Sequence, residues 1–185
     1  MSYSIFDVEE NKVLEKCKSL ALRYVSMQIK TEGQVAEYLK KKDFEKEIIE
    51  EAIEYLRQYN YVNDAEYCKV FFKEGCRKGK GRRRIEQELS NKRVSREVIK
   101  GAIDELVSYD NPEYDELLQE VGSEKERALA VGRKMLRQHE ELGKVADKNF
   151  MARVGRRLVS LGYGNDVLYS TVGTLMNERK VTEDE

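Results

Sequence analysis

The side chains with the clearest chemical potential in this sequence are the cations of one short stretch. In RKGKGRRRIEQEL, residues 77–89, six cations surround two glycines. Arginine and lysine form charge-assisted hydrogen bonds to phosphate oxygens. Glycine allows a backbone to approach a phosphate closely, and a helix N-terminus presents unpaired N–H groups to an anion. The stretch therefore indicates a phosphate-binding surface, with these candidate residues: Arg77, Lys78, Lys80, Arg82, Arg83 and Arg84.

The other reactive residue types form no recognisable catalytic site. The single histidine, His139, stands in the polar run QHEELG without a matching cysteine, serine or carboxylate, so we expect it at the surface. The motifs GxxxxGK[ST] and GxGxxG at a strand end are both missing. Carboxylates are abundant but scattered over the chain. We therefore expect a protein that is not an enzyme and binds no cofactor.

Cysteine usage and hydropathy indicate the compartment. Three cysteines (Cys17, Cys68, Cys76) and one histidine give neither an even disulfide framework nor a zinc ligand set. The acidic start MSYSIFDVEENK has no basic leader and no apolar run, unlike a secretion signal. No segment reaches the roughly 20 apolar residues that cross a bilayer. These features predict a reduced, cytoplasmic protein without a membrane partner, in which the cysteines are small packing residues.

The elements that position the cations are predicted to be helices. Apolar residues recur at spacings of three and four, no segment alternates with period two, and only Pro112 interrupts the chain. The pairs Thr31–Gln34, Asn63–Glu66 and Ser123–Glu126 have the spacing of capping boxes. We expect no regular structure beyond residue 178. The predicted helices are approximately 11–30, 33–42, 45–59, 64–78, 82–91, 95–108, 124–140, 148–161 and 165–178.

One hydrophobic pattern, here called the ladder, occurs three times in the same register. Its spacing crosses a helix break without an insertion, which indicates a tandem repeat. Each block of roughly 50 residues would bury too little surface to be stable alone, so the copies should pack on one another. The positions of the first copy are Val35, Leu39, Phe44, Ile48, Ile49, Ala52, Ile53 and Leu56; those of the second lie 50 residues later, and those of the third a further 69 residues on.

These observations predict an all-α fold of three tandem three-helix repeats that form an elongated, curved body. We place the repeats at 11–60, 62–108 and 124–179, with an acidic linker at 109–123. The helix break inside the ladder falls at Gly162 in the third repeat, where glycine ends a helix at least cost in the left-handed conformation. Aspartate tolerates this conformation at the equivalent Asp43. Arginine would be strained at Arg93, so a different cap is open for the second repeat.

The repeat brings the basic stretch into register with a second group of cations. Arg84 and Arg153 occupy the same repeat position, where the first repeat has Gln34. Because stacked repeats place equivalent positions on one face, we predict a basic surface shared by repeats two and three. A solvated charge-rich surface is the alternative, and Glu86 and Glu88 partly neutralise the stretch. The second group of cations contains Arg133, Lys134, Arg137, Arg153, Arg156 and Arg157.

Charge is strongly segregated along the chain despite a net charge of −1. The segment 64–101 has 12 basic and 6 acidic residues, whereas the segment 102–126 has 1 basic and 9 acidic residues. The acidic segment has two interpretations. It is either a solvated linker with a helical stretch, or a self-masking segment that competes with nucleic acid for the neighbouring basic surface.

The stretch VNDAEYCKVFFKEGCRKGKGRRRIEQEL, residues 62–89, together with the ladder, resembles the RecX regulatory proteins. Cys68 stands where that family more usually has alanine, and among LKKKDF, LSNKRV and LVSLGY only the last keeps the glycine of the family's helix break. The resemblance implies three tandem three-helix units that lie in the groove of the filament formed by RecA recombinase on DNA. It also implies inhibition of strand exchange, ATPase and co-protease activities.

On this interpretation the partners are the RecA filament and single- and double-stranded DNA, bound without sequence preference by a monomer. The basic residues of repeats two and three would hold phosphates or an acidic recombinase surface. Two other function classes stay open at this point. One is a helical nucleic-acid-binding protein without a recombinase partner, and the other is a helical-repeat protein scaffold.

Overall fold

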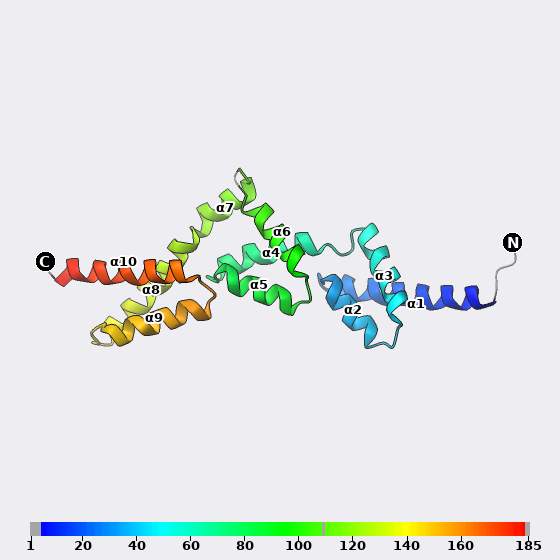
Figure 1. The fold of residues 1–185 in the computed structure, drawn as a ribbon, viewed down its shortest axis with the longest axis horizontal. Helices are drawn as coiled ribbons and strands as arrows, with labels where there is room; N and C mark the ends of the chain where they lie inside the picture. Colours follow the sequence, from blue (N-terminus) through cyan, green and yellow to red (C-terminus); the bar gives the residue numbers. More distant parts are fainter. Residues whose placement is uncertain (1–4, 109, 184–185) are drawn as a thin grey trace. The chain divides into compact units, whose positions relative to one another are not determined.

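The computed structural model describes residues 5–108 and 110–183, and every regular element within these ranges is an α-helix (Figure 1). This confirms the predicted fold class. The helices are α1 (Ile5–Met27), α2 (Glu32–Lys40), α3 (Lys46–Gln58), α4 (Asp64–Arg77), α5 (Arg82–Asn91), α6 (Arg96–Leu106), α7 (Pro112–Val121), α8 (Glu124–Glu141), α9 (Lys148–Ser160) and α10 (Asn165–Glu183).

The helix ends follow the sequence signals closely. Thr31 and Ser123 each begin a helix with a reciprocal capping box, as predicted. The Asn63 side chain accepts a hydrogen bond from the Glu66 backbone N–H at 3.0 Å. The prediction for the C-terminal end was wrong, because α10 continues to Glu183. Residues 184–185 lie outside the described ranges.

The ladder forms the buried side of the helices. All of its side chains in the three repeats are buried or half-buried. Leu39, Ile85 and Leu158, for example, are fully buried. The first copy belongs to one apolar cluster and most of the third copy to another, and each buried Leu, Ile or Val contributes about 1.5–3 kcal/mol to folding.

The break inside the ladder has the same backbone conformation in all three repeats. The angle φ is +59° at Asp43, +68° at Arg93 and +85° at Gly162. The next residue in each case donates a hydrogen bond to the carbonyl five residues earlier, as in a Schellman motif. The alternative of a different cap for the second repeat was therefore wrong. Tertiary contact holds arginine in the left-handed region.

The described helices divide between two compact units. The first contains the residues through Lys69 together with Leu89–Ala102, and the second contains Val70–Glu88 and the residues from Ile103 onward. In the first unit α1 packs against α2 and α3. In the second unit α8 packs along α10, and both contact α9 (Figure 1).

Each unit contains the same contact between consecutive repeats, here called the docking contact. In the first unit the Thr31 hydroxyl donates to the Lys92 carbonyl at 2.5 Å. In the second unit the Gly81 N–H donates to the Leu161 carbonyl at 2.8 Å. Thr31 and Gly81 are equivalent positions, and so are Lys92 and Leu161. The start of the second helix of one repeat therefore binds the helix break of the next repeat.

A carboxylate completes each docking contact. The first residue of α4, Asp64, accepts a hydrogen bond from the Glu32 N–H at 2.9 Å. The first residue of α8, Glu124, accepts one from the Arg82 N–H at 3.0 Å. Glu32 and Arg82 are the first residues of α2 and α5. Each carboxylate satisfies a free N–H at the positive end of the helix dipole.

The third repeat closes this docking position with its own side chains. Helix α9 begins at Lys148, three residues before the position equivalent to Glu32 and Arg82. Phe150 takes the place of Thr31 and Gly81 and is buried. The His139 ring stacks on Phe150 with centroids 4.4 Å apart, and the Arg153 guanidinium lies over the same ring. His139 is thus partly exposed, and it also packs against the buried Phe150.

Candidate nucleic-acid interface

The glycine turn of the basic stretch is closed by the protein itself. A Cβ atom on Gly81 would lie 2.5 Å from the Gly162 carbonyl oxygen, so glycine is required by a close approach of backbone to backbone. The N–H groups of Gly81 and Arg82 donate to Leu161 and Glu124. The expectation that this helix start offers these N–H groups to a phosphate was wrong, because protein acceptors occupy them.

The cations at the start of α5 are held by carboxylates. Arg82 is half-buried and binds Glu86 and Asp104, each at 2.6 Å. Glu88 accepts hydrogen bonds from Lys80 at 2.5 Å and Arg84 at 2.9 Å. Partial burial of Glu88 opposes ionisation, but the hydrogen bonds from both cations prevail and lower its pKa.

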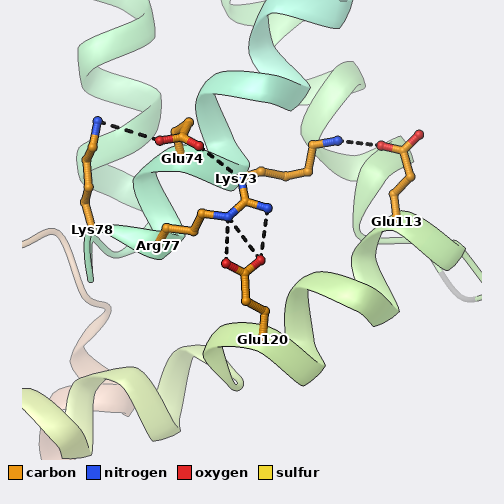
Figure 2. Close-up of polar contacts among 6 residues, drawn as sticks. All are labelled: Lys73, Glu74, Arg77, Lys78, Glu113 and Glu120. Atoms are coloured by element: carbon orange, nitrogen blue, oxygen red, sulfur yellow. Dashed lines mark hydrogen bonds and ion pairs between the residues drawn. The ribbon is translucent and has the colours of Figure 1, made fainter.

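The acidic segment 109–123 contains α7, and α7 binds cations of α4 (Figure 2). Lys73 donates to Glu113 at 2.6 Å. The Arg77 Nε lies 2.9 and 3.0 Å from the two oxygens of Glu120. Arg77 also binds Glu74, and these hydrogen bonds, Glu120 first, raise its pKa. Leu117 of α7 is buried, so the helix is anchored as well as ion-paired.

The remaining cation at the end of α4 shares one of these carboxylates. Lys78 lies 3.8 Å from the second oxygen of Glu74 (Figure 2). Five of the six candidate cations in the basic stretch therefore contact carboxylates. The exception is Arg83, which forms no hydrogen bond or ion pair with any residue that the structure describes. A cation already engaged in this way must exchange one anion for another to bind phosphate.

The cations of the third repeat lie in a different environment. Arg133 is paired with Glu178, its Nε at 3.2 Å from Oε2. Arg153 donates to the Nδ1 of His139 at 3.1 Å, and Nε2 of this ring lies 3.2 Å from the Val145 carbonyl. The neutral imidazole with its proton on Nε2 satisfies both contacts. Arg153 therefore keeps an uncompensated charge.

Four further cations of the second group have no polar side-chain partner within residues 5–108 and 110–183: Lys134, Arg137, Arg156 and Arg157. Helix α9 contains Lys148, Arg153, Arg156 and Arg157 but no carboxylate. Arg153, Arg156 and Arg157 have the spacing i, i+3, i+4, so they lie on one side of α9. This side of α9 is here called the α9 stripe.

Arg84 and Arg153 lie at different points along α9. The backbone of Arg84 packs at the C-terminal end of α9, since a Cβ on Gly162 would lie 2.3 Å from the Arg84 nitrogen. Arg153 lies nine residues before Gly162, about 13 Å along the helix axis. Arg83 reaches the same end, with a guanidinium nitrogen 3.9 Å from a Cβ built on Gly164. A face shared by Arg84 and Arg153 stays a prediction.

Of the carboxylates that shape this surface, Glu86 and Glu88 were expected from the sequence to neutralise part of the stretch, whereas Glu113, Glu120 and Glu124 were missed. The ion pairs of Arg82 with Glu86 and of Arg84 with Glu88 have i, i+4 spacing and were open to prediction. Glu113, Glu120 and Glu124 were not, because α7 and α8 must fold against the second repeat before these pairs exist.

Within the described ranges no helix has the length and apolar character to cross a membrane. Among the same residues, no group of three or more histidine, cysteine, aspartate and glutamate side chains is arranged to hold a metal. The three cysteines are buried, as predicted for packing residues. Burial raises the pKa of Cys17 and of Cys68 to about 11.

Three-helix units joined by a repeated docking contact define a helical-repeat protein. The family model of the first three-helix domain of RecX matches residues 17–56, and the family model of the second three-helix domain matches residues 63–103. The chain is 32% identical to the regulatory protein RecX of Clostridium perfringens strain SM101 over 180 residues, which is 94% of this chain and 78% of the relative.

The chain is also 33% identical to the RecX of Clostridium botulinum strain Alaska E43, over 92% of this chain and 76% of the relative. The crystal structure of RecX from Lactobacillus salivarius is similar in fold, with a TM-score of 0.70 at 20% identity; the match covers 88% of this chain and 96% of that one. The chain belongs to the RecX family of regulatory proteins, which confirms the resemblance.

Proposed function

We propose that this RecX-family regulator of RecA binds the RecA–DNA filament and inhibits strand exchange, ATPase and co-protease activities. The α9 stripe, joined by Arg83 and Arg137, is its principal phosphate contact. The observation that carries the proposal is that α9 has four cations and no carboxylate. The guanidinium groups of α9 can bind a phosphate without first breaking an ion pair with a carboxylate.

The contact with DNA is electrostatic and independent of sequence. Arginine binds phosphate oxygens through paired hydrogen bonds, and each neutralised phosphate releases counterions. The logarithm of the binding constant should therefore fall linearly with the logarithm of salt concentration, with a slope of about −0.7 to −0.9 per phosphate. Three or four contacts would give strong binding at low salt only.

Inhibition follows from occupancy of the filament. A protein held in the filament groove by its basic helix excludes the second duplex that strand exchange requires. It also changes the extension of the filament, on which nucleotide hydrolysis depends. The mechanism is steric and electrostatic, so no residue of the regulator performs a chemical step.

The basic stretch of the second repeat has a supporting role in this proposal. Arg77, Lys78, Lys80, Arg82 and Arg84 hold α4, α5 and α7 through their carboxylate partners. They add positive potential near the filament but contact fewer phosphates than the α9 stripe. This ranking differs from the sequence, in which the basic stretch is the densest cluster.

The deciding experiment is a titration of the protein against RecA ATPase activity on single-stranded DNA. Wild-type protein should suppress hydrolysis at near-stoichiometric amounts. The double reversal R153E/R157E should weaken both this suppression and DNA binding measured by fluorescence anisotropy against salt. The matched control K12E/K16E reverses two exposed cations of α1 with the same spacing and should behave as wild type.

Each outcome assigns the function. DNA binding by the wild type without ATPase suppression would favour a nucleic-acid-binding protein without a recombinase partner. Negligible DNA binding at low salt would favour a protein scaffold. Equal loss in both double variants would show that total charge matters and the α9 stripe does not. The pair R84E/R153E tests in addition whether the second repeat shares the surface.

A further inference from the structure

A shallow apolar groove lies between α9 and α10 in the second unit. Its volume is about 480 Å³. Seven of its eight lining residues are uncharged, and the exception is Arg156. The lining residues are Met151, Ala152, Gly155, Arg156, Val159, Leu168, Tyr169 and Val172.

The rim of this groove exposes large apolar side chains. Val159 is 56% exposed and Tyr169 is 73% exposed. Met176, one helical turn beyond Val172 on α10, is 43% exposed. An exposed apolar patch bordered by polar residues marks an interaction site on a folded protein.

The first repeat has a groove at the equivalent positions with opposite chemistry at its rim. Ile49 and Ile53 occupy the places of Leu168 and Val172, so the apolar floor is kept. The exposed rim positions are charged instead. Lys40, Glu50 and Arg57 stand where the third repeat has Val159, Tyr169 and Met176, and Lys41 and Lys46 add further charge.

The first groove also shows what kind of contact this site makes. Its edge is covered by Arg93 from the next repeat, whose Nε lies 3.2 Å from a Glu37 oxygen. At the position of Glu37 the third repeat has Arg156, which has no polar partner within the described ranges. The charge is reversed, so the matching contact for the third groove is a carboxylate.

We propose that the α9–α10 groove docks an acidic segment of a partner protein. The segment inserts an aliphatic or aromatic side chain between Val159 and Tyr169 and places a carboxylate on Arg156, which leaves Arg153 and Arg157 of the α9 stripe for phosphate. A nucleobase fits less well, because the aliphatic walls would leave its polar edges without hydrogen bonds. We take the partner protein to be RecA, and in this respect the inference rests on the proposed function.

The test exchanges the rim for that of the first repeat. The variant V159K/Y169E installs the residues found at Lys40 and Glu50 and leaves the net charge unchanged. Binding to purified RecA is measured without DNA by biolayer interferometry, and DNA binding is measured separately. We expect at least about a tenfold loss of affinity for RecA, as for other buried interface anchors, and no change in DNA affinity.

The matched control is M27E/I29K, which makes the same kinds of change at two exposed apolar residues, Met27 at the end of α1 and Ile29 just after it. It should bind RecA as the wild type does. Both variants should retain the wild-type circular dichroism spectrum and melting temperature, because all four positions are exposed.

Three results would overturn the inference. If wild-type protein does not bind RecA, the proposed function fails together with the groove. If the wild type binds and V159K/Y169E binds equally well, only the groove fails. If V159K/Y169E loses single-stranded DNA and keeps RecA, the groove is a base-stacking site instead.

Discussion

The basic stretch of the second repeat and helix α9 of the third repeat are both rich in arginine, but only the first is surrounded by carboxylates. Arg82 lies between Glu86 and Asp104, whereas Arg156 and Arg157 have no ionic partner among the described residues. In the second repeat most of the positive charge stabilises the fold. In the third repeat Arg133 is paired with Glu178, but no carboxylate among the described residues holds the arginines of α9. Charge density in a sequence therefore locates cations without showing which of them are available.

The largest effect is expected from Gly162, which seats the end of α9 against the second repeat. In G162A the new Cβ would meet the Arg84 backbone at 2.3–2.8 Å, at a φ of +85°. We expect a loss of about 3 kcal/mol in the free energy of unfolding, measured by urea denaturation.

The control is a substitution at Arg93, the position equivalent to Gly162 in the other docking contact. In R93G the left-handed residue becomes glycine, which relieves strain while losing the exposed pair with Glu37. The free energy of unfolding should change by less than about 1 kcal/mol. A G162A protein as stable as the wild type would contradict the close approach described here.

The contrast between the two basic regions can be broken with single arginine substitutions. R82Q should lower the free energy of unfolding by about 1–2 kcal/mol, because Asp104 and Glu86 lose their partner, and should leave DNA affinity nearly unchanged. R157Q should leave the free energy of unfolding nearly unchanged. It should weaken DNA binding and lower the salt slope of that binding by about 1. Chemical denaturation and anisotropy titrations on both variants measure the two quantities. Equal effects of the two substitutions would remove the distinction.

How much of this was visible in the sequence differs between the fold and the site. The ladder fixed the helices and their register, since a spacing of three and four admits few other structures. It also located the left-handed break at Gly162. The pairing of Arg77 with Glu120 was hidden, because 43 residues separate them and they meet only once α7 has folded beside α4.

The role of Gly81 was misjudged for a related reason. A glycine flanked by cations is typical of a phosphate loop, but the same freedom serves a close approach of the chain to itself. Only the backbone of Leu161–Tyr163, folded against this turn, distinguishes the two. Which group lies against a glycine depends on the tertiary structure and cannot be read from the adjacent residues in the sequence.

A smaller effect is expected from releasing the cations that α7 holds. E113Q/E120Q should free Lys73 and Arg77 for phosphate and raise DNA affinity about two- to fivefold at low salt, with a steeper salt slope. Anisotropy titration measures both. The control D115N/E116Q removes two charges from the same helix. If both variants gain affinity equally, the effect is general repulsion by α7, and masking of specific cations is excluded.

The smallest effect concerns pH. Hydrogen bonds from Arg77 hold the pKa of Glu120 below its ordinary value of 4.5, and Arg133 lowers the pKa of Glu178 in the same way. A carboxyl with a lowered pKa in the folded state stabilises the protein above about pH 4.5 and loses this contribution as the pH falls through the folded-state value. The melting temperature should be flat from pH 7 to pH 5 and decline below 4.5. The decline should be shallower in E120Q.

The closed end of α9 has a consequence for how copies of the protein meet. A chain that displayed an open docking edge at one end and a helix break at the other would hold both halves of a head-to-tail joint. Such joints generate unlimited polymers because they do not close on themselves. Phe150, which packs against the His139 ring and the Arg153 guanidinium, fills the docking position of the third repeat, so one of the two surfaces needed for such a joint is missing. The third repeat therefore offers no open docking position to the helix break of a second copy.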